Sequence, residues 1–133
     1  MKTTFIINGE APAKKNNRRT LANGQTIPSA GHVAWHDAAM FQFRHDYPDF
    51  LHRPPISQPV RIRLSFYHNT KQRRDSDNQA TSILDLLKDL AVIQDDCWQI
   101  VRELEILNYY DRQHPPFCGV EILTPKTTEF HYK

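Results

Sequence analysis

The sequence has no apolar run near the ~20 residues that a membrane-spanning helix needs, so we expect no membrane segment and no membrane partner. Residues 1–8 turn polar too soon for a secretory signal peptide. Only two cysteines are present, Cys97 and Cys118, and they form no CxxC pair. We therefore expect two free thiols in a cytoplasmic protein rather than a disulfide.

Other absences exclude several enzyme classes. The sequence has no P-loop, no glycine-rich dinucleotide loop and no nucleophile elbow. It also has no strong charge bias: 17 Lys and Arg face 15 Asp and Glu, which gives a net charge of +2. Such a weak bias does not by itself indicate nucleic-acid binding, so the clustering of charged residues must decide that question.

The 133 residues, 39% hydrophobic and 11% aromatic, suit one globular domain. Strand patterns occur at residues 4–7, 60–67, 99–109 and 117–123. Helices are expected over 31–43, capped by Ser29, and after a cap at Asp77 or Asn78. This order predicts an α+β (mixed α/β) fold over residues 1–133: a single small domain in which two main helices pack on a mixed sheet of about four strands.

Side-chain periodicity suggests which faces are buried. On the first helix, the expected apolar side is Val33, Ala34, Met40, Phe41 and Phe43. The pair His32 and His36 is expected to have structural or surface roles rather than to bind a metal. On the second helix, the expected buried face is Ala80, Ile83, Leu84, Leu87, Leu90 and Ala91. Leu86 falls on the opposite face, where it is either a lone surface leucine or part of a subunit contact.

Charged residues gather in two basic runs and two acidic groups. The first basic run contains Lys14, Lys15, Arg18 and Arg19, in a stretch that is either a solvated loop or a phosphate contact; the second contains Lys71, Arg73 and Arg74. The acidic groups are Asp75 with Asp77, and Asp95 with Asp96, on the two sides of the second helix.

These carboxylates suit a hard ion, Mg²⁺ or Mn²⁺, that acts on a phosphodiester. In the alternative interpretation, Asp75 and Asp77 are turn and cap residues, and Asp95 and Asp96 lie in an exposed loop. An EF-hand is excluded, because Ala80 stands in place of the required glycine and Leu86 in place of the closing glutamate.

At these residues the chain resembles the RusA family of Holliday junction resolvases (crossover junction endodeoxyribonucleases), which phages and prophages often carry. The family pattern is a basic run, then D-x-D-N, a further acid and D-D. In this chain the pattern is carried by Arg73, Arg74, Asp75, Asp77, Asn78, Asp85, Asp95 and Asp96. The loop around Lys14 and the strand 60–67 extend the similarity over most of the chain.

The resemblance implies a magnesium-dependent homodimer that nicks two strands of a four-way DNA junction symmetrically, in recombination and repair. Asp75, Asp77 and Asp96 match the essential metal-binding, catalytic aspartates, and Asp95 and Asp85 are candidate supporting acids. Backbone phosphates of the branched DNA are expected to contact Lys14, Lys15, Arg18, Arg19, Lys71, Arg73 and Arg74.

Thr81 departs from the family pattern. It stands four residues after Asp77, where the family usually has a lysine, and a threonine supplies no positive charge. Two alternatives therefore stay open beside an active nuclease. One is a weakened or inactive protein that binds branched DNA; the other is an unrelated domain whose acids are caps and turns.

Overall fold

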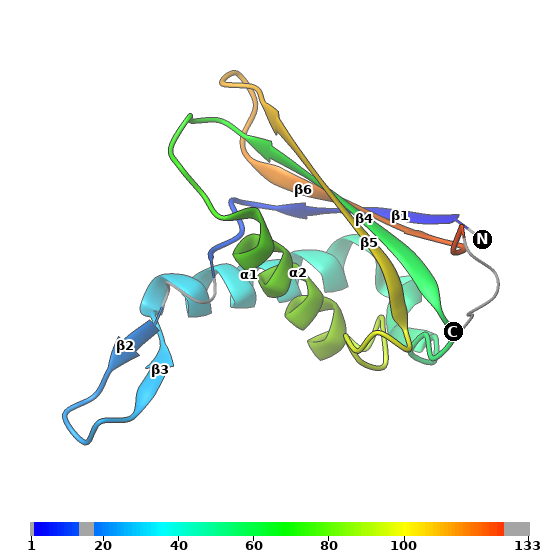
Figure 1. The fold of residues 1–133 in the computed structure, drawn as a ribbon, viewed down its shortest axis with the longest axis horizontal. Coiled ribbons are helices and arrows are strands. Elements are labelled where there is room, and N and C mark those ends of the chain that lie inside the picture. Colours follow the sequence, from blue (N-terminus) through cyan, green and yellow to red (C-terminus); the bar gives the residue numbers. More distant parts are fainter. Residues whose placement is uncertain (1, 14–17, 127–133) are drawn as a thin grey trace, which may run out of the picture.

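A computed structural model describes residues 2–13 and 18–126. Four strands form the main sheet, β1 (Lys2–Asn8), β4 (Val60–His68), β5 (Val101–Tyr110) and β6 (Phe117–Leu123), in the order β1-β6-β4-β5. β6 is antiparallel to both of its neighbours, whereas β4 and β5 are parallel. The mixed sheet of about four strands is confirmed, and β5 forms one edge of it (Figure 1).

Two helices cover one face of this sheet (Figure 1). α1 (Ala30–Asp46) begins at the predicted cap, where Ser29 Oγ accepts the N–H of His32 at 3.2 Å. α2 (Ser76–Asp89) connects the parallel strands β4 and β5, as such strands require a crossover. A short 3₁₀ helix, η1 (Pro48–His52), follows α1. No helix among the described residues is long and apolar enough to cross a membrane.

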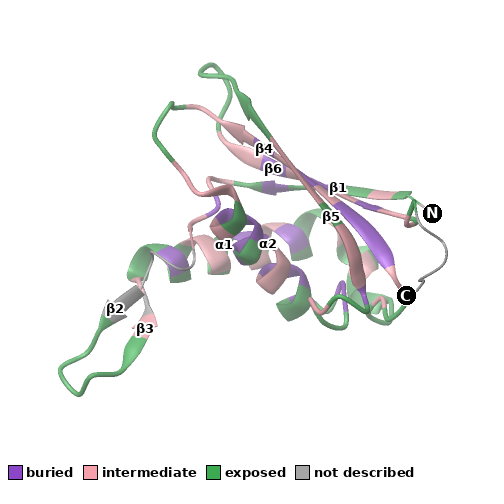
Figure 2. Ribbon diagram, in the orientation of Figure 1, coloured by how far each residue is buried: buried purple, intermediate pink, exposed green. Residues whose placement is uncertain are grey.

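The core lies between the sheet and the helices. Alternate residues of β4, such as Ile62, Leu64 and Phe66, are fully buried against the helices, as the strand pattern predicts. Figure 2 shows this buried layer along β4 and β6. Cys97 and Cys118 are free thiols, as expected, and burial raises the pKa of Cys118 far above its ordinary value.

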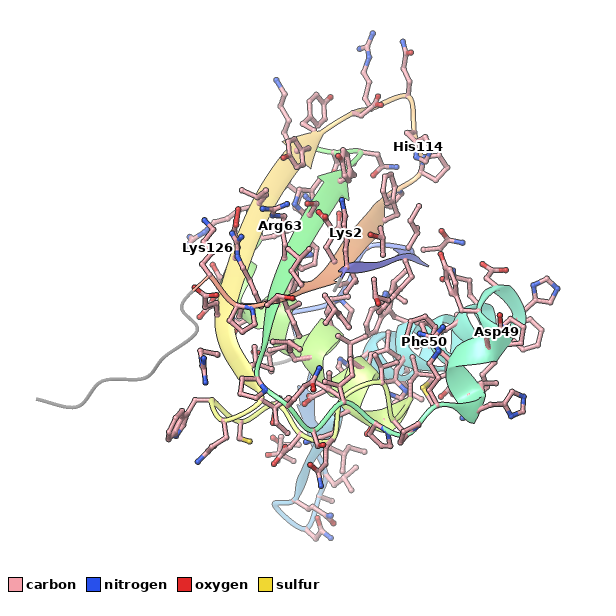
Figure 3. The ribbon with its side chains drawn as sticks, turned by 90° about the vertical axis from the view of Figure 1, so that its right-hand side faces the viewer. Lys2, Asp49, Phe50, Arg63, His114 and Lys126 are labelled. Atoms are coloured by element: carbon pink, nitrogen blue, oxygen red, sulfur yellow. The ribbon has the colours of Figure 1, made fainter. Side chains whose placement is uncertain are left out.

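The opposite face of the sheet carries charged side chains. Arg63 contacts Glu105 and Glu121, both at 3.4 Å, and Lys2 reaches Glu121 at 3.6 Å (Figure 3). Glu105, with help from Glu121, raises the pKa of Arg63. Arg61 is buried and also pairs with Glu105. This face is therefore polar at the end of the sheet where β4 begins.

The predicted outward position of Leu86 is wrong: its side chain is fully buried. The buried side of α2 is wider than the apolar pattern, because Gln79 and Ser82 are buried too. These two polar side chains donate to the carbonyl oxygens of Ala11 and Pro12, at 2.7 and 2.6 Å. In the sequence, a helix face that contains two polar residues looks exposed to solvent. Here that face packs against the segment that contains Ala11 and Pro12.

The predicted apolar side of α1 is also partly wrong. Val33 is 44% exposed and Phe41 is 75% exposed, while His32, Ala39 and Phe43 are buried. Phe43 packs in an aromatic group with Phe5, Tyr47 and Phe50. His36 Nε2 donates to Oδ2 of Asp89 on α2 at 2.8 Å, which agrees with a structural role for this histidine.

Part of the stretch predicted as a loop forms a hairpin. β2 (Arg18–Thr20) pairs with β3 (Thr26–Pro28), and the hairpin projects from the rest of the structure (Figure 1). Three-residue strands are too short for alternation to identify them. The turn contains Gly24 at φ 86°, a conformation that favours glycine.

Candidate active site

The first acidic group lies at the start of α2. Asp75 occupies the N-cap position, two or three residues earlier than predicted, and Asp77 is in the first turn. Both carboxylates benefit from the positive end of the helix dipole. However, the Asp75 side chain makes no capping hydrogen bond, and its contacts with Asn78 (3.5 Å) and Arg73 (3.9 Å) are long. An accessible carboxylate that does not cap its helix is well suited to bind an external cation.

The two arginines before Asp75 have different environments. The Arg73 side chain is 94% exposed, so its guanidinium can reach a phosphate. Arg74 is only 16% exposed. Its guanidinium donates to the carbonyl oxygens of Thr70 and Gln72 and to the Thr70 hydroxyl, at 3.3, 2.8 and 2.6 Å. Arg74 therefore holds the backbone before the site, whereas Arg73 is placed for the phosphate contact that was predicted for both.

Glu10, which no sequence pattern singles out, organises the other side of the site. Its carboxylate accepts from Gln79 Nε2 at 2.8 Å and pairs with Arg74 Nε at 3.1 Å. His68 Nδ1 lies 2.9 Å from the same carboxylate. Glu10 thus joins the end of β1 to the end of β4 and to the first turn of α2. A lone glutamate at the edge of a basic loop has no sequence signature for this role.

An open hollow of about 530 Å³ lies beside Asp75. Its walls come from the segment after β1 and from the segment before α2, and they are Glu10, Ala11, Pro12, Ala13, Gln72, Arg73, Arg74, Asp75 and Gln79. The hollow offers both an acidic and a basic side chain to a bound chain. A phosphodiester that enters it can meet Asp75 and Arg73 together.

Thr81 and Asp85 follow Asp77 along α2. Thr81 is exposed, and its hydroxyl donates to the carbonyl oxygen of Asp77 at 2.9 Å. Asp85 lies one turn further and is half-buried. The position where the sequence resemblance expects a lysine therefore presents a neutral hydroxyl that already has a partner in the backbone.

The second acidic group lies at the other end of α2. Asp96 Oδ1 is 4.0 Å from Nζ of Lys88, in the last turn of the helix. Asp95 Oδ1 accepts the N–H of Asp96 at 2.8 Å, and this bond lowers the pKa of Asp95. A helix of 14 residues is about 21 Å long.

Asp75 and Asp77 thus lie at the start of α2, whereas Asp95 and Asp96 follow its other end. Among residues 2–13 and 18–126, no three His, Cys, Asp or Glu side chains form a group that could hold a metal ion. The assignment of Asp75, Asp77 and Asp96 as a joint metal site stays a prediction.

Comparison with known families now bears on this site. A family model described as endodeoxyribonuclease RusA matches residues 8–122. The chain belongs to the RusA endodeoxyribonuclease family. The match runs from the end of β1 to β6 and includes both acidic groups. Membership supports a Holliday junction resolving endonuclease that acts on branched DNA. No curated protein matches the chain.

The other residues predicted to contact DNA in this RusA family member differ in how much of each the structure describes. Lys14 and Lys15 lie outside the described residues, and only the backbone of Arg18 and Arg19 is described, in β2. Lys71 is exposed, and its Nζ lies 5.2 Å from the ring centre of Tyr110. Lys71 and Arg73 are therefore exposed cations in the segment that ends at the anchored Arg74.

Proposed function

We propose that this RusA family member is a metal-dependent endonuclease that resolves four-way DNA junctions in recombination and repair. The observation that supports this most directly is the accessible Asp75 carboxylate, which sits at the N-cap of α2 without capping it. Asp77 follows in the same turn, and the exposed Arg73 precedes it.

The donor set fits a hard divalent cation. Asp75 and Asp77 offer carboxylate oxygens, which Mg²⁺ and Mn²⁺ prefer, and neither carboxylate has a strong ion-pair partner among the described contacts. When bound, the cation supplies charge stabilisation at the phosphate and makes water more acidic. Arg73 binds a phosphate of the strand, while Glu10 and Arg74 keep the segment before Asp75 in place.

We further propose that the active form is a homodimer. The opposite ends of α2 carry the two acidic groups, and two helices related by a two-fold axis can place one end beside the other end of a second copy. Asp96 of the second subunit would then join Asp75 and Asp77 of the first. Two such sites in one dimer suit a paired cut of two strands.

A weaker, binding-only activity is the second candidate function, and Thr81 favours it. Its hydroxyl donates to the Asp77 carbonyl oxygen and provides no positive charge beside the proposed site. In this case the chain binds branched DNA through the same surfaces but cuts slowly or not at all.

Cleavage assays on synthetic DNA test the leading proposal. We expect the protein to nick a four-way junction in Mg²⁺ or Mn²⁺, to nick a linear duplex of the same sequence much more slowly, and to be inactive in EDTA. Equal cleavage of both DNAs would contradict junction selectivity, and cleavage that persists in EDTA would contradict metal dependence. Tight junction binding without any cleavage would favour the second candidate.

A further inference from the structure

Three aromatic rings form a continuous stack across the sheet. Phe117 on β6 stacks on Tyr67 of β4, with ring centres 4.5 Å apart and planes within 12°. Tyr67 stacks in turn on Tyr109 of β5, at 4.7 Å and 15°. The register explains this order, because Tyr67 is directly opposite both Phe117 and Tyr109. The stack therefore runs perpendicular to the strands, from the interior of the sheet toward its edge.

The stack ends at Tyr109. β5 is the edge strand of the main sheet, and the Tyr109 side chain is 44% exposed. Among the described residues, Tyr67 is its only ring partner, so the second face of the Tyr109 ring is open for another flat group. Three parallel rings fix the orientation of this face more firmly than one mobile tyrosine could.

A cation lies on the other side of the same edge strand. The following residue, Tyr110, is 49% exposed and points to the other side of β5. Its ring holds Nζ of Lys71 at 5.2 Å from the ring centre. A hollow of about 300 Å³ joins these groups, and its walls are His68, Thr70, Lys71, Gln72, Arg74, Ser76, Asn108, Tyr109 and Tyr110.

This hollow is tied to the proposed active site. Asn108 Nδ2 donates to Ser76 Oγ at 3.0 Å, which links the residue before Tyr109 to the residue after Asp75. Asn108 Oδ1 lies 2.9 Å from His68 Nε2, and His68 also contacts Glu10. A strand whose phosphate lies at Asp75 can therefore follow this hollow to the edge strand β5, and the Tyr109 ring stands on the other face of that strand.

We infer that the open face of Tyr109 binds an unstacked nucleobase at the branch point of the DNA, while Lys71, on the other side of the edge strand, contacts a phosphate of the same DNA strand. Bases inside a duplex already stack on both faces, so only a base at an interruption of the helix can use this ring. The inference rests on the proposed function, because it concerns the DNA that the Asp75 site would cut. It adds a contact that selects branched over linear DNA.

Binding to four-way junctions in EDTA tests this inference without any cleavage. We expect Tyr109→Leu to weaken binding about 5- to 150-fold, the range that one base-on-aromatic stack supports, and Tyr109→Phe to bind as wild type. Binding to a linear duplex should not change. Phe41→Leu is the matched control, because Phe41 is a 75% exposed aromatic residue on α1. Lys71→Gln should reduce the salt dependence of the binding constant by the amount expected for about one phosphate contact.

Junctions with single abasic nucleotides at each branch-point position make the test independent of folding. For the wild-type protein, one abasic position should weaken binding about as much as Tyr109→Leu does. For Tyr109→Leu, the same abasic position should not weaken binding any further. The inference would be overturned if the substitution and the abasic position weakened binding additively. It would also be overturned if Tyr109→Leu bound junctions like wild type. A variant that loses only its dimeric state would overturn it too, since the ring face would then contact a second copy.

Failure here can be separated from failure of the proposed function. If the wild type binds junctions but never cuts them, the nuclease proposal fails while the abasic comparison still decides the role of Tyr109. If it binds no junction, the same substitutions are compared on a single-stranded oligonucleotide. Loss of binding specific to Tyr109→Leu supports the stacking site there, and equal binding, or no binding by any variant, overturns it.

Discussion

Nζ of Lys88 lies 4.0 Å from Oδ1 of Asp96, and both side chains are at the end of α2 opposite to Asp75. α2, which separates these two side chains from Asp75, is about 21 Å long. A site that needs Asp75, Asp77 and Asp96 together therefore has to draw them from more than one copy of the chain. This geometry turns the dimer from a symmetry expectation into a requirement of the proposed chemistry.

Mixing two inactive variants tests that requirement. Asp77→Asn and Asp96→Asn should each be inactive as homodimers. In a mixed dimer, the wild-type Asp77 of one subunit meets the wild-type Asp96 of the other, so one intact site forms. We expect nicking activity to return on mixing, with single nicks rather than paired cuts. If mixtures stay inactive although mixed dimers are shown to form, the shared site is contradicted.

Substitution of Thr81 tests whether a missing cation limits the reaction. A lysine at this position, one turn after Asp77, would put a positive charge beside the phosphate. We expect Thr81→Lys to raise the cleavage rate about 10-fold or more at saturating DNA. Thr81→Met, similar in length but neutral, serves as the control. An equal rate in wild type and Thr81→Lys would show that another group already supplies the charge.

Arg73 and Arg74 should behave differently although they are neighbours. Arg73 is 94% exposed, so Arg73→Ala should weaken DNA binding several-fold, lower the salt slope by about one and leave the melting temperature unchanged. Arg74 binds the Thr70 and Gln72 carbonyls and Glu10, so Arg74→Ala should lower the melting temperature. Melting curves and salt titrations of both variants measure this contrast. Identical behaviour would contradict the assigned roles.

Glu10 should contribute to stability as well as to the site. Glu10→Gln removes the negative charge that Arg74 and His68 face, and we expect a loss of about 1–3 kcal/mol in the free energy of unfolding. Cleavage should fall as the segment before Asp75 loosens. Glu103→Gln is the control, because Glu103 Oε1 accepts the N–H of Lys126 away from this network. Unchanged urea unfolding of Glu10→Gln would show that the network stabilises little.

The sequence predicted most of the fold because its main signals are local. The alternation in residues 60–67 identifies β4, and Ser29 marks the start of α1. Leu86 was misplaced because the burial of Gln79 and Ser82 depends on Ala11 and Pro12, about 70 residues away in sequence. Polar side chains that satisfy buried carbonyl groups look the same in a sequence as polar side chains in water.

The candidate site was predictable in type but not in geometry. The spacing of Asp75, Asp77, Asp95 and Asp96 indicated a carboxylate site and matched the family that the chain belongs to. It placed the two pairs at the two ends of the helix, but it could not show whether Asp96 folds back toward Asp75, nor that Glu10 anchors Arg74. These relationships arise from tertiary contacts between β1, β4 and α2, which no local pattern encodes.

The rate at which Asp77→Asn nicks a four-way junction at fixed Mg²⁺ tests the central claim most directly. Asp49→Asn, an exposed aspartate on η1, is the matched control. Substitutions that only disturb a metal ligand's surroundings cost about 10- to 100-fold, so loss of a ligand should cost at least about 100-fold. We predict that loss for Asp77→Asn, with Asp49→Asn and the wild type equally active. Nicking by Asp77→Asn at the wild-type rate would contradict the proposed metal-dependent nuclease site.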